Sequence, residues 1–363
     1  MLSSKERALK ALKGLEPDRP PIYTSVTHQV GNMLNDHLGL APEDPVDSFL
    51  STRVSYTEAL TMLGNDFVAV AAGRPDKFVA KHNADGTITD EWGISWIDTG
   101  VYSEMADHPL KHAETVADIV NYPFPDSMTP GRFEHAANQI SKYGSDYAII
   151  GEQECTILEL SWYLTGLEKF LMDLMMERPY IFELMDRVME INLQQACKLV
   201  DMGADIIWTG DDIGNQSGMM LDPEHWRRYF KPRLQHVFST LKKHNPDVLI
   251  AYHSCGSILP VIPDLIEIGL DILNPIQPMA SGMDAAFLKT TYGDRLSFFG
   301  GIDIQNILPF ASSQEVSAHI REKKNILGKG GGYILAPAHN IQPDTPLENI
   351  LAYFDEAKKA INV

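Results

Sequence analysis

The sequence has little positive charge, few cysteines and no long apolar runs, and each shortage excludes a class of protein. Its 363 residues include 30 lysines and arginines against 49 aspartates and glutamates, which gives a formal net charge of −19. Nucleic-acid binding needs a cationic surface that releases counterions from phosphates, so we exclude nucleic acid as a partner. No apolar run reaches the roughly 18 residues that a membrane-spanning helix needs, so no membrane segment is predicted.

The cysteines and the N-terminal segment both predict a cytoplasmic protein. The cysteines, Cys155, Cys197 and Cys255, are an odd number in a large chain and do not form the pattern of a disulfide framework. Residues 1–15 are charged and amphipathic, and they lack the apolar core and small-residue cleavage site of a secretory signal. No repeat or low-complexity linker divides the chain, so residues 1–363 are predicted to form a single domain.

Short apolar segments alternate with amphipathic segments that are long enough for crossover helices. A capping box at Ser3 and Glu6 predicts an N-terminal helix that ends near Gly14. Strands are predicted at residues 22–23, 67–71, 147–150, 205–208, 248–252, 271–273, 296–299 and 332–335. Eight parallel strands predict an α/β fold, a closed (β/α)8 TIM barrel. Asp85-Gly86 predicts a small β-hairpin inserted after the second strand.

Barrels of this kind place the active site at the carboxyl ends of their strands, so the polar residues that follow each predicted strand are the candidates. In chain order these are His28, Glu152, Glu154, Cys155, Asp211, Asp212, His253, Cys255, Asn274, Gln277, Asp303, His339 and Asn340.

A metal site is predicted from three of these residues. His253 and Cys255 are two positions apart, so on extended backbone both side chains point to one side and can share a metal ion. Alone, such a pair is more often incidental. His339 follows the eighth strand at the matching end and supplies a third candidate ligand. Three protein ligands with one open position is the form of zinc site that catalysis requires.

The acidic candidates allow several roles. Asp211 or Asp212 can be a fourth ligand, a residue that fixes the tautomer of a histidine, or a helix cap, and we expect only one of the two to affect turnover. Glu154 is favoured over Glu152 as a catalytic carboxylate, and Asp303 is a further catalytic candidate. The candidates for substrate binding are His28, Asn274, Gln277 and Asn340.

Several segments together resemble the uroporphyrinogen decarboxylase superfamily. They are Arg7, residues 11–20, 253–256, 300–303, 331–339 and 343–349, and the likeness extends over essentially the whole chain. It is closer to the cobalamin-dependent methyltransferase branch, whose barrel has a zinc site with a His-x-Cys pair and a later ligand after the eighth strand. The resemblance therefore implies zinc at His253, Cys255 and His339, and a corrinoid protein as partner.

The chain departs from the true decarboxylases at two places. Their arginine-rich N-terminal segment grips the carboxylates of the substrate, whereas residues 21–29 here contain no arginine. Their catalytic aspartate after the second strand has no counterpart in residues 68–73. A tetrapyrrole with many carboxylates also gains little from an acidic site, so porphyrinogen decarboxylation is disfavoured.

The chain also departs from the coenzyme M methyltransferases, which have cysteine as the last zinc ligand where this chain has His339. Zinc with more neutral ligands keeps more positive charge, which suits polarising an ether oxygen. The leading hypothesis is therefore methyl transfer between a small donor, such as an aryl methyl ether, and the cobalt of a corrinoid protein. The reverse reaction with a thiol acceptor would use the same site.

Two other classes stay open. One is a lyase acting on a carboxylated substrate, which needs cationic residues at the mouth of the barrel. Arg74 and Lys77 are the candidates for that role. The other is a barrel that has lost catalysis and only binds its ligand.

Overall fold

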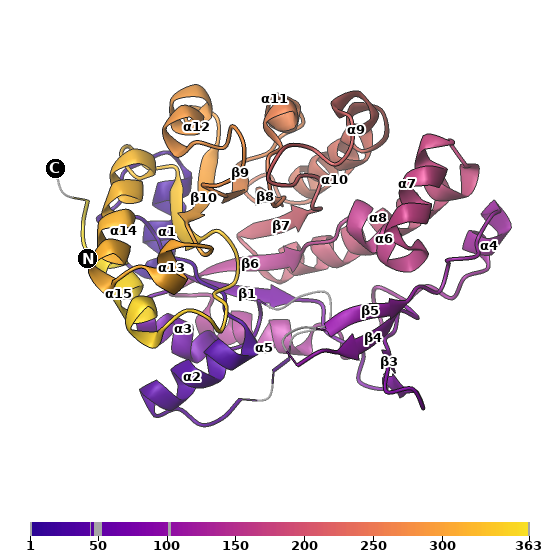
Figure 1. Ribbon diagram of the computed structural model, residues 1–363, viewed down its shortest axis with the longest axis horizontal. Coiled ribbons are helices and arrows are strands. Elements are labelled where there is room, and N and C mark those ends of the chain that lie inside the picture. The colour runs from indigo at the N-terminus through magenta and orange to yellow at the C-terminus, as the bar shows by residue number, and fades with distance from the viewer. Residues whose placement is uncertain (1, 44, 47–52, 101–102, 362–363) are drawn as a thin grey trace.

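A seven-stranded parallel sheet forms the centre of the molecule (Figure 1). The computed structural model describes residues 2–43, 45–46, 53–100 and 103–361. The strands pair in the order β1-β6-β7-β8-β9-β10-β11. Their bounds are β1 Phe67–Ala71, β6 Ala148–Gln153, β7 Ile206–Gly210, β8 Leu249–His253, β9 Ile272–Ile276, β10 Ser297–Ile302 and β11 Tyr333–Pro337. These seven strands overlap seven of the eight predicted segments.

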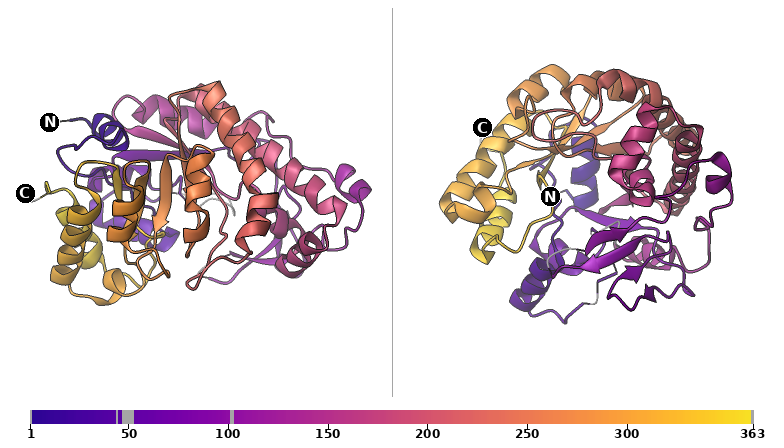
Figure 2. Two further views of the ribbon diagram at one scale, coloured as in Figure 1. Left: turned by 90° about the horizontal axis from the view of Figure 1, so that it is seen from above. Right: turned by 45° about the vertical axis from the view of Figure 1, so that its right-hand side comes forward.

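Helices follow the strands and cover the outside of the sheet (Figure 2). The first is α1 Ser4–Leu12, which begins at the predicted capping box of Ser3 and Glu6. None of the helices in the described ranges is both long and apolar enough to cross a membrane. The others are α2 His28–Leu38, α3 Thr57–Leu63, α4 Val116–Val120, α5 Glu134–Tyr143, α6 Leu158–Thr165, α7 Leu167–Met175, α8 Pro179–Met202, α9 Pro223–Tyr229, α10 Lys231–His244, η1 Leu259–Val261, α11 Ile262–Glu267, α12 Ala285–Tyr292, α13 Ile307–Phe310, α14 Ser313–Leu327 and α15 Leu347–Ala357.

The predicted strand at residues 22–23 is instead a short connection between the two edge strands of the sheet. On one side the Tyr23 N–H donates to the Leu335 carbonyl of β11, and the Leu335 N–H donates to the Pro21 carbonyl. On the other side the Asp66 N–H, next to β1, donates to the Ile22 carbonyl. Proline has no N–H to extend such a ladder, so only isolated bridges form here. Through this connection the sheet curls into a barrel, which in the described residues has seven regular strands where the sequence predicts eight.

Buried Asp66 fastens the connection to the rest of the barrel. Its carboxylate accepts hydrogen bonds from Arg7 at 2.8 Å, from Arg19 at 2.6 Å and from the Ile22 N–H at 2.8 Å. Two cations and a backbone donor thus compensate a carboxylate that has no exposure to solvent. The N-terminal helix and the connection are held to the same buried charge.

A second sheet of four antiparallel strands lies between β1 and β6 in the sequence. Its strands are β2 Lys81–His82, β3 Ile88–Thr89, β4 Ser95–Asp98 and β5 Ser103–Asp107, and we call residues 78–107 the inserted segment. Asp85-Gly86 lies in the turn between β2 and β3, where the sequence predicts a hairpin, and Gly86 has a φ of 88° that favours glycine. The inserted sheet is larger than the predicted hairpin because β4 and β5 extend it.

Alternate residues of the barrel strands form two separate apolar layers. One cluster fills the barrel interior, and Phe67, Ile150, Trp208, Phe299 and Ile334 belong to it. Their strand neighbours join the larger cluster that packs against the helices. The barrel is therefore a packed core and not a pore, so a site has to be built from the polar residues at the strand ends.

Candidate metal centre

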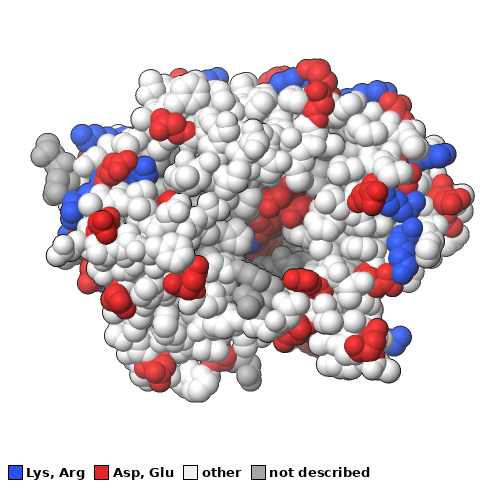
Figure 3. Space-filling model, viewed as in Figure 1, with Lys and Arg blue, Asp and Glu red and all other residues white. Residues whose placement is uncertain are grey.

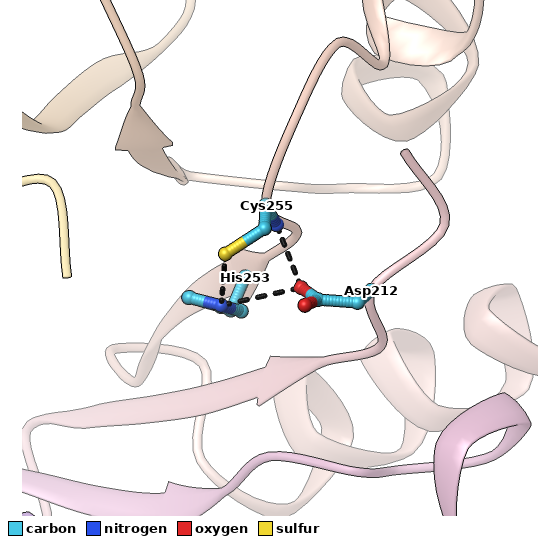
Figure 4. Close-up of side chains that lie close together, drawn as sticks. All are labelled: Asp212, His253 and Cys255. Carbon is cyan, nitrogen blue, oxygen red and sulfur yellow. Dashed lines mark hydrogen bonds and ion pairs between the residues drawn. The ribbon is translucent and has the colours of Figure 1, made fainter. Parts of the chain in front are cut away.

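Three side chains with metal-binding atoms, Asp212, His253 and Cys255, meet at the carboxyl ends of β7 and β8 (Figure 4). We call them the metal group. One ligand atom of each lies within 4.8 Å of the other two. His253 Nε2 lies 3.4 Å from Asp212 Oδ1 and 3.6 Å from Cys255 Sγ. The predicted pair of His253 and Cys255 is thus brought together, with a carboxylate beside it.

Strand register explains why the metal group forms. Gly210, the last residue of β7, pairs with His253, the last residue of β8. A Cβ at position 210 would lie 2.9 Å from the Cβ of His253, so this close approach requires glycine. Asp212 follows two residues later and accepts a hydrogen bond from the Cys255 N–H at 2.7 Å. This backbone contact holds the carboxylate beside the two predicted ligands.

Asn274 of β9 fixes the orientation of the His253 ring. The two residues are in register, and Asn274 Oδ1 lies 2.6 Å from His253 Nδ1. An amide oxygen only accepts hydrogen bonds, so Nδ1 donates and Nε2 is the nitrogen that faces Asp212 and Cys255. Histidines that bind metals are usually held in this way. The sequence suggested Asn274 for substrate binding, whereas the structure places its amide against His253.

The charges of the metal group stabilise one another. Burial lowers the pKa of His253, but Cys255 and Asp212 outweigh this effect and raise the pKa to about 10. Burial raises the pKa of Asp212, but the hydrogen bond and positive charge of His253 outweigh it and lower the pKa to about 2. The surroundings of Nε2 are therefore arranged for a positive charge, which a proton or a metal cation can supply.

Glu154, directly after β6, lies on another side of the same ring. Its Oε1 is 3.0 Å from His253 Nε2. Arg53 forms an ion pair with Glu154, lies 3.7 Å from Glu152 and stands over the Trp208 ring at 4.8 Å. The structure thus places the favoured candidate Glu154 beside His253, while Glu152 faces the arginine.

Arg53 is a site residue that the sequence did not indicate. It lies between α2 and α3 rather than after a strand, and no motif surrounds it. The sequence proposed Arg74 and Lys77 as the cations nearest the mouth, but Arg53 is the one that contacts the carboxylate beside His253.

His339 lines the same small pocket as His253, Arg53 and Asn274, but it is not a member of the metal group. Burial, followed by the positive charges of Arg53 and His253, lowers the pKa of His339 to about 4, and Asp212 opposes this only in part. The ring is therefore neutral at pH 7 and has a nitrogen lone pair to donate. The structure brings Asp212, rather than His339, within 4.8 Å of the other two ligand atoms.

Asp211 caps a helix. Its two carboxylate oxygens lie 3.1 Å and 3.0 Å from the Ile157 nitrogen, and Oδ1 accepts from the Glu159 N–H at 2.9 Å. These N–H groups belong to the start of α6, where helices lack internal acceptors. Burial and the charge of Glu159 raise the pKa of Asp211. Of the two neighbouring aspartates, Asp212 reaches the metal group and Asp211 does not.

Asp303 and Gln277 line a second small pocket on the rim. Asp303 accepts hydrogen bonds from the backbone N–H groups of Gln305 at 2.6 Å and Asn306 at 3.0 Å, so it stabilises its own turn. Gln277 accepts from the Gly256 N–H at 2.7 Å and so holds the loop that follows Cys255.

Asn340 and His28 lie near the connection that closes the barrel. The Ser25 hydroxyl donates to Asn340 Oδ1 at 2.5 Å, and Asn340 lines the pocket that contains His253 and His339. His28 is the first residue of α2, and its ring centre lies 6.0 Å from that of Tyr56. Neither Asn340 nor His28 belongs to the metal group, whose ligand atoms lie within 4.8 Å of one another.

The metal group fits a zinc ion. It offers one nitrogen, one sulfur and one oxygen, all of which zinc accepts as ligands. Two atoms bound to the same tetrahedral zinc lie about 3.5 Å apart. The separations of 3.4 Å and 3.6 Å between His253 and its two neighbours are close to that value.

A cleft that is open to solvent at its mouth lies beside the metal group. Its walls come from the ends of β1 and β6, from α6 and α8, and from the inserted segment. The space-filling view of Figure 3 shows a hollow near the centre of the visible face, with acidic side chains inside it. Residues 152–155 line the cleft and include Glu154, which contacts His253.

Two groups of curated proteins resemble the chain over part of its length. The methylcobamide:CoM methyltransferase MtaA of Methanosarcina barkeri is 26% identical over 211 residues, which cover 58% of this chain and 58% of the relative. A uroporphyrinogen decarboxylase of Trichormus variabilis is 29% identical over 167 residues, or 45% of this chain and 43% of that protein. The chain thus matches about half of the length of these relatives.

A solved structure and a family profile match more of the chain than these relatives do. The structure of a methyltransferase from Methanosarcina mazei covers 98% of this chain and 98% of its own, with a TM-score of 0.68 and 22% identity. At that identity the likeness shows a shared fold. The profile of the uroporphyrinogen decarboxylase (URO-D) family matches residues 100–360, which contain β6 to β11 and the whole metal group. The chain therefore belongs to the URO-D family.

Proposed function

We propose that this protein is a zinc-dependent methyltransferase. It moves a methyl group between a small donor, such as an aryl methyl ether, or a thiol acceptor and the cobalt of a partner corrinoid protein. The metal group of Asp212, His253 and Cys255 is the main support, because its donors gather where barrel enzymes have their active sites. The relative named methylcobamide:CoM methyltransferase supports the class of reaction.

His253 and Cys255 would hold the zinc, with Asp212 or His339 as the third protein ligand. The separations within the metal group favour Asp212, and the neutral ring in the same pocket keeps His339 in the proposed set. When bound, zinc supplies a Lewis acid that polarises an ether oxygen or lowers the pKa of a thiol.

Residues around the metal group prepare it for this role. Asn274 holds His253 Nδ1, so that Nε2 stays turned toward the other ligands. Arg53 holds Glu154, whose Oε1 can accept a hydrogen bond from a protonated His253 Nε2 when no metal cation is bound. The Trp208 ring packs on the barrel side of His253, with its centre 6.0 Å from that of the imidazole.

The remaining candidate residues form two groups, those that bind backbone N–H groups and those that lie near the rim of the barrel. Asp211 and Asp303 bind backbone N–H groups, so we assign them to holding the loops in place rather than to chemistry. Gln277, Asn340 and His28 line the rim or lie close to it, and we keep them as proposed substrate contacts.

A lyase acting on a carboxylated substrate is the second candidate function. Arg53 is the cation near His253 that such an enzyme could use. Such an enzyme needs a cation that grips substrate carboxylates. Arg53 is already paired with Glu154 and lies near Glu152, which leaves it little charge for a further carboxylate. The ion pairs therefore favour the methyltransferase over the lyase.

Metal analysis combined with a methyl-transfer assay tests the proposed function. We expect about one zinc per chain. We also expect cob(I)alamin to become methylcobalamin in the presence of an aryl methyl ether, or methylcobalamin to lose its methyl group to a thiol. Cys255→Ala should lose zinc and transfer together, whereas the matched control Cys197→Ala, on α8, should keep both. Transfer that persists in zinc-free protein contradicts the proposal, and release of carbon dioxide without methyl transfer supports the lyase.

A further inference from the structure

Glu159, near the start of α6, is a buried carboxylate that contacts the metal group through the backbone of Asp212. Only 8% of its surface is exposed. Its Oε2 accepts a hydrogen bond from the Asp212 N–H at 3.0 Å, and its Oε1 accepts one from the Tyr163 hydroxyl at 3.0 Å. Glu159 therefore joins α6 to a residue of the metal group.

Asp212 is confined by packing much less than His253 is. Its side chain is 38% exposed, whereas that of His253 is 3% exposed. It also lies beyond Gly210, the last residue of β7, so the pairing of β7 with β8 does not include it. A side chain in such a position keeps its conformational freedom unless specific contacts remove it. The hydrogen bonds of Asp212 therefore decide whether its carboxylate stays beside His253.

Two hydrogen bonds hold Asp212, one at its side chain and one at its backbone. Its Oδ1 accepts from the Cys255 N–H at 2.7 Å, and its own N–H donates to Glu159. The first bond comes from the loop that contains another residue of the metal group. The second comes from α6, a separate element, so it fixes the Asp212 backbone independently of that loop.

The N–H groups on either side of Asp212 have their acceptors in another direction. The Asp211 N–H donates to the His253 carbonyl at 3.2 Å, and the Ile213 N–H donates to the Ser254 hydroxyl at 3.0 Å. Of these three successive N–H groups, the one that donates to α6 is that of Asp212. An N–H that loses its partner inside a protein is unfavourable, so loss of the Glu159 carboxylate should allow this turn to rearrange.

Tyr163 keeps the Glu159 carboxylate in place. It follows Glu159 at the i+4 spacing, at which side chains on one face of a helix meet. Burial is the main cause that raises the pKa of Tyr163 well above its ordinary value of 10, so the hydroxyl keeps its proton and donates. The ring packs edge-on against Trp162 and against Trp96 of β4. The inserted segment thus supports Glu159 through Tyr163.

A carboxylate suits this position because both of its partners are donors. Asp212 offers an N–H and Tyr163 offers an O–H, so two acceptor oxygens are needed. In the part of the chain that the structure describes, Glu159 forms no ion pair with a lysine or an arginine. Burying a carboxylate without such a cation is costly, which indicates that the contact with Asp212 serves a purpose other than stability.

We propose that Glu159 is a positioning residue for zinc binding. It acts through Asp212, because its carboxylate fixes the Asp212 backbone so that the Asp212 side chain stays beside His253. Tyr163 in turn holds the Glu159 carboxylate. The inference rests on the proposed function in taking Asp212 as a zinc ligand, and it needs no assumption about the methyl donor.

The zinc affinity of the full chain, measured by competition with a chromophoric chelator, tests this role. We expect Glu159→Leu, which removes both acceptors, to bind zinc about 10 to 100 times more weakly than the wild type. Glu159→Gln keeps one acceptor for the Asp212 N–H, and its amide can donate to the Tyr163 oxygen, so it should retain most of the affinity. Equal affinity in Glu159→Leu and the wild type, or an equal loss in both variants, overturns the proposal.

A double-mutant cycle shows whether Glu159 acts through Asp212. In an Asp212→Ala background, Glu159→Leu should cause no further loss of zinc affinity, because the side chain that Glu159 positions is absent. A general loss of stability would instead weaken zinc binding by the same factor in both backgrounds. Equal factors therefore overturn the proposal.

Co²⁺ bound in place of zinc gives a spectroscopic readout, because its visible absorption bands report the ligand geometry. These bands should change in Glu159→Leu. The matched control Glu356→Leu removes an equally buried glutamate on α15, and it should leave both the bands and the zinc affinity as in the wild type. Wild-type bands in Glu159→Leu contradict the positioning role.

Metal binding is measured without a methyl donor, so this inference and the proposed function can fail separately. If Glu159→Leu keeps the wild-type zinc affinity while the wild type transfers methyl groups, the positioning role alone is wrong. If zinc binding is weakened as expected but the wild type transfers no methyl group, the proposed function alone is wrong. If Asp212→Ala itself keeps the wild-type affinity, Asp212 is not a ligand and the positioning role fails with that assignment.

Discussion

Replacing Asn274 with alanine should weaken zinc binding without unfolding the barrel. The change removes the acceptor that lies 2.6 Å from His253 Nδ1, so a buried N–H loses its partner and the ring is free to rotate. Leaving such a donor unpaired costs about 1–3 kcal/mol. Residues that orient a metal-binding histidine typically contribute a factor of about 10 to 100 in metal affinity. We therefore expect Asn274→Ala to bind zinc about 10 to 100 times more weakly.

Competition with a chromophoric chelator measures this affinity, and two variants control it. Asn274→Asp keeps an oxygen that accepts from Nδ1, so it should retain most of the affinity. Asn349→Ala removes an equally buried asparagine that binds the Leu308 and Ala311 carbonyls near α13, so it should cost stability but not zinc. Equal zinc affinity in Asn274→Ala and the wild type would refute the orienting role of Asn274.

Four further predictions concern the Asp211–Asp212 pair, His339, Cys255 and Lys324. Asp211→Asn should lower the free energy of unfolding by about 1–3 kcal/mol while zinc content stays the same, because its carboxylate caps α6. Asp212→Asn should lower zinc content and turnover. If elemental analysis shows zinc loss in Asp211→Asn, and denaturant unfolding shows a loss of stability in Asp212→Asn, the capping and zinc-binding roles belong to the opposite residues. If His339 is a ligand, His339→Ala should lose zinc and activity together, whereas His339→Cys should keep zinc but slow ether cleavage, since a second thiolate reduces the positive charge on the metal. Full zinc and full activity in His339→Ala would exclude His339 from the ligand set. Cys255→Ala should release zinc, and equal zinc in this variant and the wild type would remove Cys255 from that set. Burial lowers the pKa of Lys324 from its ordinary 10.5 to about 8, so the folded chain loses this proton before the unfolded chain does. The stability of the wild type relative to Lys324→Met should therefore rise as the pH rises from 8 to 10.5, and a pH-independent difference in denaturant unfolding would show this reasoning to be wrong.

The barrel strands were predictable because each is a short apolar run between turn residues, whereas the connection at residues 22–23 was not. Ile22 and Tyr23 look like a strand in sequence. The prolines before them lack the N–H groups that a ladder of hydrogen bonds needs. Only the hydrogen bonds to Leu335 and Asp66 show that the pairing is limited to isolated bridges. The size of the inserted sheet was also hidden, because β5 is largely exposed and polar and has no apolar alternation.

The candidate site was predictable where it depends on strand ends and not where it depends on tertiary contacts. His253 and Cys255 are visible as a spaced pair after a strand. Asp211 and Asp212 are adjacent residues beyond a strand, where alternation no longer decides which one faces inward, so only their hydrogen bonds distinguish them. Arg53 reaches Glu154 across 101 positions of sequence, and nothing local to it indicates that contact.

The connection that closes the barrel also determines when the protein can become complete during synthesis. Residues 21–23 precede all the barrel strands in the sequence, but their partner β11 is synthesised after the other six strands of the sheet. Until β11 is available, the growing sheet has open edges that invite pairing with other chains. Barrel closure therefore waits until the last strand of the sheet has been made, and translation that stops before β11 leaves an aggregation-prone open sheet.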